Sequence, residues 1–343
     1  MFGKLKQLFK ARQTQNPSTR ATNSTPAVAN SDAGNTTSTD TIHPIFMQTL
    51  LGGDKLGGDQ SGAADLSVPE KLVGQAVEQQ LRSREQRATS VPRLPMVIPL
   101  LLKQLRDPNA STRDYVEIIT QDSVVATAVL KVANSVYFNP YRKALDNFER
   151  AVAALGVFKL RMVLSTAVMQ PVVLNRGDNV PEQIWEHSLA CAICCQHLAE
   201  RENVDAFRAY LTGLIHDIGV VTLYNQTQLI SREYLDTRRP SNKLLEQLFA
   251  QWALPLSHWI AQDWQLSDDI VRALGEQYEA SKSISALGTI LRRSNRLCEA
   301  YHVFRAGKIS REEVERRADA LGFTPKILDI LDSGFGKLLD SNS

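Results

Sequence analysis

The stretch AYLTGLIHDIGVVTLY, residues Ala209–Tyr224, decides how the rest of this sequence is interpreted, because it carries adjacent His216 and Asp217 followed by Gly219. A histidine and a carboxylate together can hold a divalent metal ion, and the same pair can also persist as a buried polar contact. Neighbouring residues on a regular helix point about 100° apart. The two side chains can therefore converge only around an ion between helices or near a helix end, which Gly219 is suited to supply.

The sequence on both sides of this stretch repeats apolar residues with a helical period. Ser67 with Glu70, and Ser310 with Glu313, have the spacing of capping boxes that begin helices. Gly156 stands where one helical pattern stops, and glycine is common just beyond a helix C-terminus. No convincing strand appears, so we predict an all-α fold of roughly a dozen helices.

Composition divides the chain into several parts. Residues 1–12 form a short basic amphipathic segment. Residues 13–65 are rich in Thr, Ser, Asn, Gly and Asp, and they carry too little apolar surface to offset chain entropy, so we predict a disordered linker. HPIFMQTLL (His43–Leu51) within it could be a docking motif, but we favour a stretch with no role. The lead-in helix, the two portions of the main domain and the C-terminal helices are predicted at residues 66–90, 91–175, 176–300 and 301–343.

Charge and cysteine content argue against a nucleic-acid-binding protein and against a secreted, disulfide-rich protein. The chain has 343 residues, a formal net charge of +2 and four cysteines, and nothing global points to nucleic acid as a partner. Cys191, Cys194 and Cys195 lie on one helical face, which favours core packing of reduced thiols and a cytoplasmic location over a disulfide framework or a zinc site. No signal peptide and no apolar run long enough to span a bilayer is evident. Residues 1–12 would allow peripheral membrane contact, although a frayed terminus explains them better.

Six segments occur in an order that is hard to obtain by chance: LPMVIPLLLKQLRDPNAS, IITQDSVVATAVLKVANSVYF, ERAVAALGVFKLRMVL, IWEHSLACAICCQHLA, AYLTGLIHDIGVVTLY and LSHWIAQDWQLSDDIVRAL. Together, from about Leu94 to Ala300, they resemble the HDOD family of bacterial signalling domains, which are related to the HD phosphohydrolases and the HD-GYP phosphodiesterases. Ser123 and Ser267 stand where that family usually has proline. The resemblance implies a multi-helix HD-like bundle with a role in bacterial regulation.

The resemblance also implies a set of metal ligands. In an active HD enzyme, imidazoles and carboxylates converge on a divalent ion that activates water. His187, His216 and Asp217 match ligands of that site, and His258 matches a further histidine of the HD-GYP variant. Asn295 falls where the family has its closing acid, and a neutral amide is a weaker ligand. We therefore expect a vestigial or weak metal site and no catalytic residue.

Two functions remain open. The first is a non-catalytic signal-transduction module that binds proteins such as cyclic-di-nucleotide enzymes or response regulators and needs no cofactor. The second is a metal-dependent phosphohydrolase or phosphodiesterase that acts on a nucleotide through a partial HD site, with Mn, Fe, Mg or Zn bound. The depleted ligand set favours the first.

Overall fold

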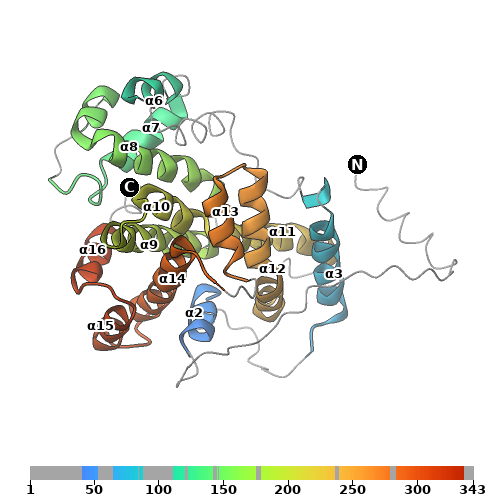
Figure 1. Ribbon diagram of the computed structural model, residues 1–343. Helices are drawn as coiled ribbons and strands as arrows, with labels where there is room; N and C mark the ends of the chain where they lie inside the picture. The colour runs from blue at the N-terminus through green and yellow to red at the C-terminus, as the bar shows by residue number, and fades with distance from the viewer. Residues whose placement is uncertain are drawn as a thin grey trace. The chain divides into compact units, whose positions relative to one another are not determined.

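Helices build the whole of the described fold (Figure 1). The computed structural model describes residues 41–52, 65–83, 85–87, 111–119, 123–141, 145, 147–174, 179–235, 239–278 and 283–335. These residues contain 13 helices and no strand, which confirms the predicted all-α class. All of them belong to one compact unit, Thr37–Ser343.

Helix α9 is the element around which many of the others are placed. It packs against α10, α14, α8, α16, α11 and α2. The helices have these bounds along the chain: α2 Ile42–Leu50, α3 Val68–Arg82, α6 Thr112–Ile119, α7 Ser123–Ala133, α8 Phe148–Val173, α9 Asn179–Glu202, α10 Ala206–Ile215, α11 Ile218–Tyr234, α12 Asn242–Asp263, α13 Asp268–Gly275, α14 Ala286–Arg305, α15 Arg311–Ala320 and α16 Lys326–Phe335.

Helix α2 lies inside the stretch for which the sequence predicted a disordered linker, so that prediction is wrong for these residues. Ile42, Phe46 and Leu50 recur at every fourth position, share one helical face and are each at most 4 % exposed. The polar composition of residues 13–65 as a whole hides this short apolar period. Nine residues are too few for a stable isolated helix, and packing against α14 and α9 supplies the stability that is missing.

Other N-terminal predictions fall outside the described residues. Residues 1–12, 13–40 and 53–64 are not among them, so the basic segment and most of the linker stay predictions. The lead-in helix is present as α3, and it opens on the expected capping box. The Ser67 side chain accepts from the Glu70 N–H, and the Ser67 N–H donates to Glu70 Oε2 at 3.0 Å.

Helix α8 is interrupted at Gly156, where the sequence pattern stopped. Gly156 has φ +70°, in the left-handed region where glycine carries no Cβ penalty. Contrary to the expectation of no membrane-length run, Arg150–Gln170 is long and apolar enough to cross a membrane by length and composition. Half of that window is buried within the fold, and Val157 and Phe158 in it are exposed.

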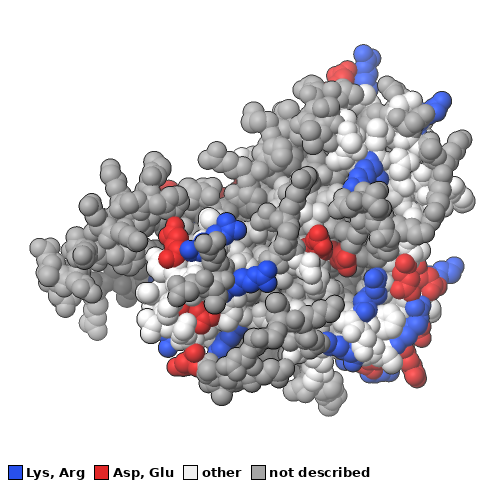
Figure 2. All heavy atoms as spheres, turned by 180° about the vertical axis from the view of Figure 1, so that it is seen from behind, with Lys and Arg blue, Asp and Glu red and all other residues white. Residues whose placement is uncertain are grey.

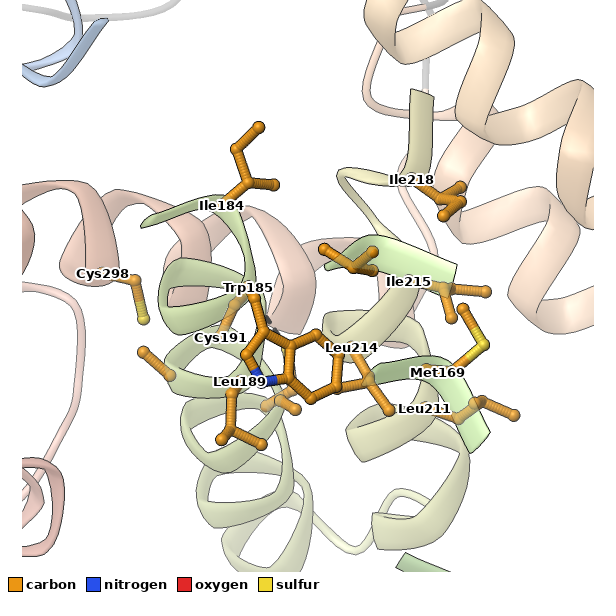
Figure 3. Packing of buried hydrophobic residues seen from close by; sticks show 14 of the residues in the cluster. Met169, Ile184, Trp185, Leu189, Cys191, Leu211, Leu214, Ile215, Ile218 and Cys298 are labelled. Carbon is orange, nitrogen blue, oxygen red and sulfur yellow. Dashed lines mark hydrogen bonds between the residues drawn. The ribbon is translucent and has the colours of Figure 1, made fainter. Parts of the chain in front are cut away.

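Helices α9 and α10 approach each other closely at Gly213. A Cβ added to Gly213 would lie 2.7 Å from Ala192 Cα and 2.7 Å from the Cys191 carbonyl oxygen of α9. Figure 3 shows the indole of Trp185 extending from α9 beside Leu214 of α10, and this tryptophan is 1 % exposed. The small residue at 213 therefore sets the spacing between these two helices.

The four cysteines are buried and unpaired as thiols, as the core-packing interpretation predicted. Cys194 Sγ of α9 lies 3.6 Å from Cys298 Sγ of α14, and Cys191 Sγ lies 4.0 Å from Cys195 Sγ one turn along α9. Burial raises the pKa of each of these thiols. They therefore contribute apolar contacts to the interface between α9 and α14.

The C-terminal helices pack onto the main body of the fold. Helix α15 contacts α14, and α16 contacts α9. Tyr301 of α14 donates its hydroxyl hydrogen to Asp332 Oδ1 of α16 at 2.8 Å, and Arg293 Nε donates to the Leu321 carbonyl at 2.7 Å. Figure 2 shows one face of the molecule, on which the described basic and acidic side chains are interspersed rather than separated by sign.

Candidate functional site

His187, His216 and Asp217 come together although they belong to different elements. His187 lies within α9 and is 3 % exposed, and His216, 4 % exposed, follows the last residue of α10. Asp217 is the N-cap residue of α11, so His216 and Asp217 form the two-residue turn between α10 and α11. A turn frees their side chains from the divergence that a continuous helix would impose.

Gly219 holds this turn in place. Its N–H donates to Ser257 Oγ of α12 at 2.9 Å, and an added Cβ would lie 2.1 Å from the Ala253 carbonyl oxygen. Only glycine allows the first turn of α11 to lie so close to the α12 backbone. The residue that the sequence suggested as a helix end therefore acts as a contact point that fixes where Asp217 lies.

Four polar atoms meet between these helices. Asp217 Oδ2 lies 3.5 Å from His187 Nε2 and 3.3 Å from His216 Nε2. Asn295 Oδ1, from α14, lies 2.8 Å from His187 Nε2 and 3.2 Å from His216 Nε2. We call these four residues the His/Asp/Asn cluster. Ligand atoms of its two histidines and its aspartate all lie within 4.8 Å of one another.

Asn295 is oriented by a further residue on its own helix. Its amide nitrogen donates to Glu299 Oε1 at 3.2 Å, which leaves Oδ1 facing the two imidazoles. Glu299 is 6 % exposed, and the same oxygen lies 2.9 Å from His43 Nδ1 of α2. Neither Glu299 nor His43 was predicted from the sequence as a residue of this site. The available signal was the four-residue spacing of Asn295 and Glu299, which puts them on one helical face.

One imidazole nitrogen of the cluster, His216 Nε2, has no hydrogen to donate to the oxygens that face it. His216 Nδ1 lies 2.7 Å from the Gly213 carbonyl oxygen, so this nitrogen carries a hydrogen and donates it. His216 Nε2 then faces two acceptor oxygens, from Asp217 and Asn295. In a neutral imidazole that nitrogen has only a lone pair. A second proton or a metal ion would make these contacts attractive.

His187 is held in its neutral form. Burial lowers the pKa of His187 to about 3, although the nearby Asp217 carboxylate opposes the shift. Its Nε2–H donates to Asn295 Oδ1, and among the described residues its Nδ1 has no hydrogen-bond partner. A buried nitrogen without a partner costs about 1–3 kcal/mol, which a core selected for stability alone avoids.

The cluster fits a divalent cation in spacing but only partly in charge. Ligand atoms about 2.1 Å from a common ion lie about 3–3.5 Å from their neighbours, which agrees with the separations in the cluster. Asp217, His216 and His187 would hold the ion, with the Asn295 oxygen as a weak fourth ligand. The hydrogen of His187 would then move from Nε2 to Nδ1, because a ligating nitrogen needs its lone pair. Two neutral imidazoles, one carboxylate and one amide supply a single negative charge, whereas a second carboxylate would double it.

His258, the fourth predicted ligand residue, lies outside this cluster. It belongs to α12, and its Nδ1 lies 2.9 Å from the Val271 carbonyl oxygen of α13. Its ring meets the Tyr278 ring edge-on, with the centroids 5.8 Å apart. Because a carbonyl only accepts, His258 donates there and ties α12 to α13. The structure therefore brings together three of the four residues that the resemblance implied.

Helix α2 packs against α14 and α9, and Figure 1 shows it beside α14. Its Phe46 ring contacts His187 of the cluster. The Phe46 ring centroid lies 4.7 Å from that of His187 and 5.3 Å from that of His302. A cavity of about 240 Å³ adjoins this contact, with Thr49 of α2, Glu186 of α9 and Arg305 of α14 among its lining residues. Burial raises the pKa of the Glu186 carboxyl group.

We expect the free energy of unfolding to decrease as the pH falls below about 6. Burial, with help from the charge of Arg305, lowers the pKa of His302 to about 4. Between that value and the pKa of about 6.5 in the unfolded chain, the unfolded state binds more protons, so this stability is complete above pH 6.5 and is lost toward pH 4. At about 1.4 kcal/mol per pKa unit, His302 contributes up to about 3 kcal/mol.

Urea unfolding at several pH values between 4.5 and 7 measures this dependence. His302→Gln removes the titrating group, so its unfolding free energy should vary less with pH than that of the wild type. Parallel curves for the two proteins would show that His302 does not carry the effect. His187, with its similarly lowered pKa, contributes with the same sign to both proteins.

Comparisons with known proteins agree with this architecture. The family model of the HDOD domain matches residues 91–280. A crystal structure named "Putative metal-dependent phosphohydrolase", from Shewanella amazonensis SB2B, is 20 % identical, with 80 % of this chain and 99 % of that chain covered and a TM-score of 0.54. A "Putative signal transduction protein" from Marinobacter aquaeolei VT8 is 16 % identical, with 78 % and 66 % covered and a TM-score of 0.52.

A curated relative extends well beyond this chain. An "Uncharacterized protein" of Treponema pallidum (strain Nichols) is 23 % identical over an alignment of 222 residues, and the match covers 61 % of this chain. The chain spans 43 % of that protein's length. At these identities, the likeness to the solved structures shows a shared fold.

Proposed function

The chain belongs to the HDOD domain family, and from this premise we propose that it is a non-catalytic signal-transduction module that acts by binding another protein. The observation that carries the proposal is Asn295, whose neutral amide lies against both imidazoles of the cluster. A carboxylate at this point would supply the second negative charge on which tight binding of a divalent ion depends. Asn295 instead accepts a hydrogen bond from His187 of α9 and places its amide oxygen beside His216 at the end of α10.

The proposed partners are signalling proteins of the bacterial cytoplasm, such as enzymes of cyclic-di-nucleotide metabolism or response regulators. One structural neighbour is named a signal transduction protein, which supports this class of function. The fold suits the role, because a rigid helical body presents a fixed surface to a partner without any chemical step. No cofactor is needed for this activity.

A second candidate function is a metal-dependent phosphohydrolase or phosphodiesterase acting on a nucleotide. The convergence of His187, His216 and Asp217, and the lone pair that His216 Nε2 presents to two oxygens, favour it. A divalent ion bound there would lower the pKa of a coordinated water. The chain's own contribution would be to orient the ligands, through the Gly213 carbonyl on His216 and through Glu299 on Asn295.

Metal analysis and nucleotide turnover of the purified full-length protein distinguish the two functions. We expect far less than one equivalent of Mn, Fe, Mg or Zn to remain bound, since the cluster lacks the second carboxylate. Hydrolysis of nucleotide phosphodiesters in the presence of Mn²⁺ should be no faster for the wild type than for Asp217→Ala. Stoichiometric metal together with turnover that Asp217→Ala abolishes would establish the second function and refute the first.

A further inference from the structure

Helix α2 binds the rest of the fold with both apolar and polar contacts. Ile42, Phe46 and Leu50 bury one face of the helix against α14 and α9. The Phe46 ring is the central contact, since it lies between the rings of His187 and His302. At its first turn, His43 Nδ1 pairs with the nearly buried Glu299 at 2.9 Å. This is the contact pattern of an amphipathic helix in a groove, with anchors at every fourth position.

The same contacts connect α2 to the His/Asp/Asn cluster. Glu299 Oε1 pairs with His43 of α2 and accepts from the amide of Asn295, whose oxygen faces His187 and His216. Phe46 covers the His187 ring directly. Docked α2 therefore covers His187 and pairs with the carboxylate that accepts from the Asn295 amide.

The way α2 is joined to the chain suits a helix that can leave its groove. It has nine residues, too few to be stable as a helix without its contacts. Residues 53–64 connect it to α3 and include four glycines. Because α2 belongs to the same chain as its groove, it competes for the groove at a high effective concentration. A partner helix that binds the groove more tightly than α2 does can overcome that advantage.

We propose that the face of α9 and α14 beneath α2 is a docking groove for an amphipathic helix of a partner protein, and that α2 occupies this groove in cis until the partner displaces it. The inference rests on the proposed function, because it identifies the surface through which a non-catalytic module binds. The recognised helix carries large apolar residues at every fourth position, an aromatic ring at the middle one and a hydrogen-bonding side chain opposite Glu299. These features are those of α2, which occupies the groove in the structure.

A labelled peptide tests the groove in the full-length protein. The probe is a fluorescein-labelled peptide of residues 41–52, and fluorescence anisotropy measures its binding. Phe46→Asp places a carboxylate in the apolar groove and should release α2, so this variant should bind the peptide about tenfold or more tightly than the wild type, whose groove is filled. Gln48→Asp introduces the same side chain at an exposed position of α2 and should behave like the wild type.

Circular dichroism and thermal unfolding show whether Phe46→Asp remains folded. A second variant retains Phe46 and carries a specific protease site inserted within residues 53–64. After cleavage, the N-terminal fragment should exchange with the labelled peptide, whereas the uncleaved protein should not. Equal peptide binding by the wild type and folded Phe46→Asp, or no exchange after cleavage, would overturn the proposal.

Peptide binding does not depend on metal or turnover. Nucleotide hydrolysis by the wild type would therefore refute the proposed function and leave the groove measurement intact. Failure of the peptide to bind would refute the groove alone.

Discussion

Asn295→Asp should raise the affinity of the protein for Mn²⁺ by about 100-fold or more, because it adds a second negative charge to the His/Asp/Asn cluster. Asparagine and aspartate have nearly the same shape, so the new carboxylate oxygen can take the place of Asn295 Oδ1, 2.8 Å from His187 Nε2 and 3.2 Å from His216 Nε2. Isothermal titration calorimetry with Mn²⁺ measures the affinity directly.

The metal-free form of this variant should be less stable than the wild type. The new carboxylate would face Asp217 and lose the hydrogen bond that Asn295 donates to Glu299 at 3.2 Å. Mn²⁺ should restore thermal stability to Asn295→Asp and leave the wild type almost unchanged. Asn179→Asp makes the same exchange at the exposed first residue of α9 and serves as the control. Equal affinity in Asn295→Asp and the wild type would show that charge does not limit metal binding here.

Gly213→Ala should lower the free energy of unfolding by about 3 kcal/mol, at the upper end of the usual cost of overpacking. The added Cβ would lie 2.7 Å from backbone atoms of Ala192 and Cys191, and backbone cannot rotate away as a flexible side chain can. Helix α10 would have to move away from α9. His216 follows α10 and His187 lies on α9, so the same movement would separate the two imidazoles.

Gly74→Ala provides the matched control for Gly213→Ala. Gly74 also lies inside a helix, α3, but its Cβ would meet only Leu244 Cδ1 at 3.4 Å, which is an ordinary contact. Alanine should therefore stabilise that helix by about 0.5–1 kcal/mol through its higher helix propensity. Urea unfolding of both variants measures the contrast. A similar change in both would mean that close approach of α9 and α10 does not constrain residue 213.

Local signals in the sequence predicted much of the fold correctly. The Ser67 and Glu70 pair begins α3, because a capping box needs only residues three apart. The predicted interruption at Gly156 is present as a kink in α8, because glycine readily adopts φ +70° and its identity can be seen directly in the sequence. Helix α2 escaped prediction, because its apolar period covers nine residues inside a long polar stretch. Its stability comes from α9 and α14, more than a hundred residues away along the chain.

The site residues that could be predicted from the sequence are likewise those whose positions depend on nearby residues. Adjacent His216 and Asp217 required a turn or helix end to converge, and the structure has the turn. Motif resemblance pointed to Asn295, which the structure places 2.8 Å from His187 Nε2. The pairing of His43 with Glu299 joins residues 256 positions apart, so no spacing rule could reveal it. His258 shows the limit of motif matching, because its contact with α13 depends on how two helices pack.

The buried cysteines between α9 and α14 become reactive only when these two helices separate. Cys194 and Cys298 face each other across the two helices, and burial keeps all four thiols protonated. Alkylating reagents and peroxide attack thiolates that they can reach, so the closed molecule is resistant to both. Modification of a cysteine would therefore require that α9 and α14 separate. The rate of modification would measure how often this part of the core opens.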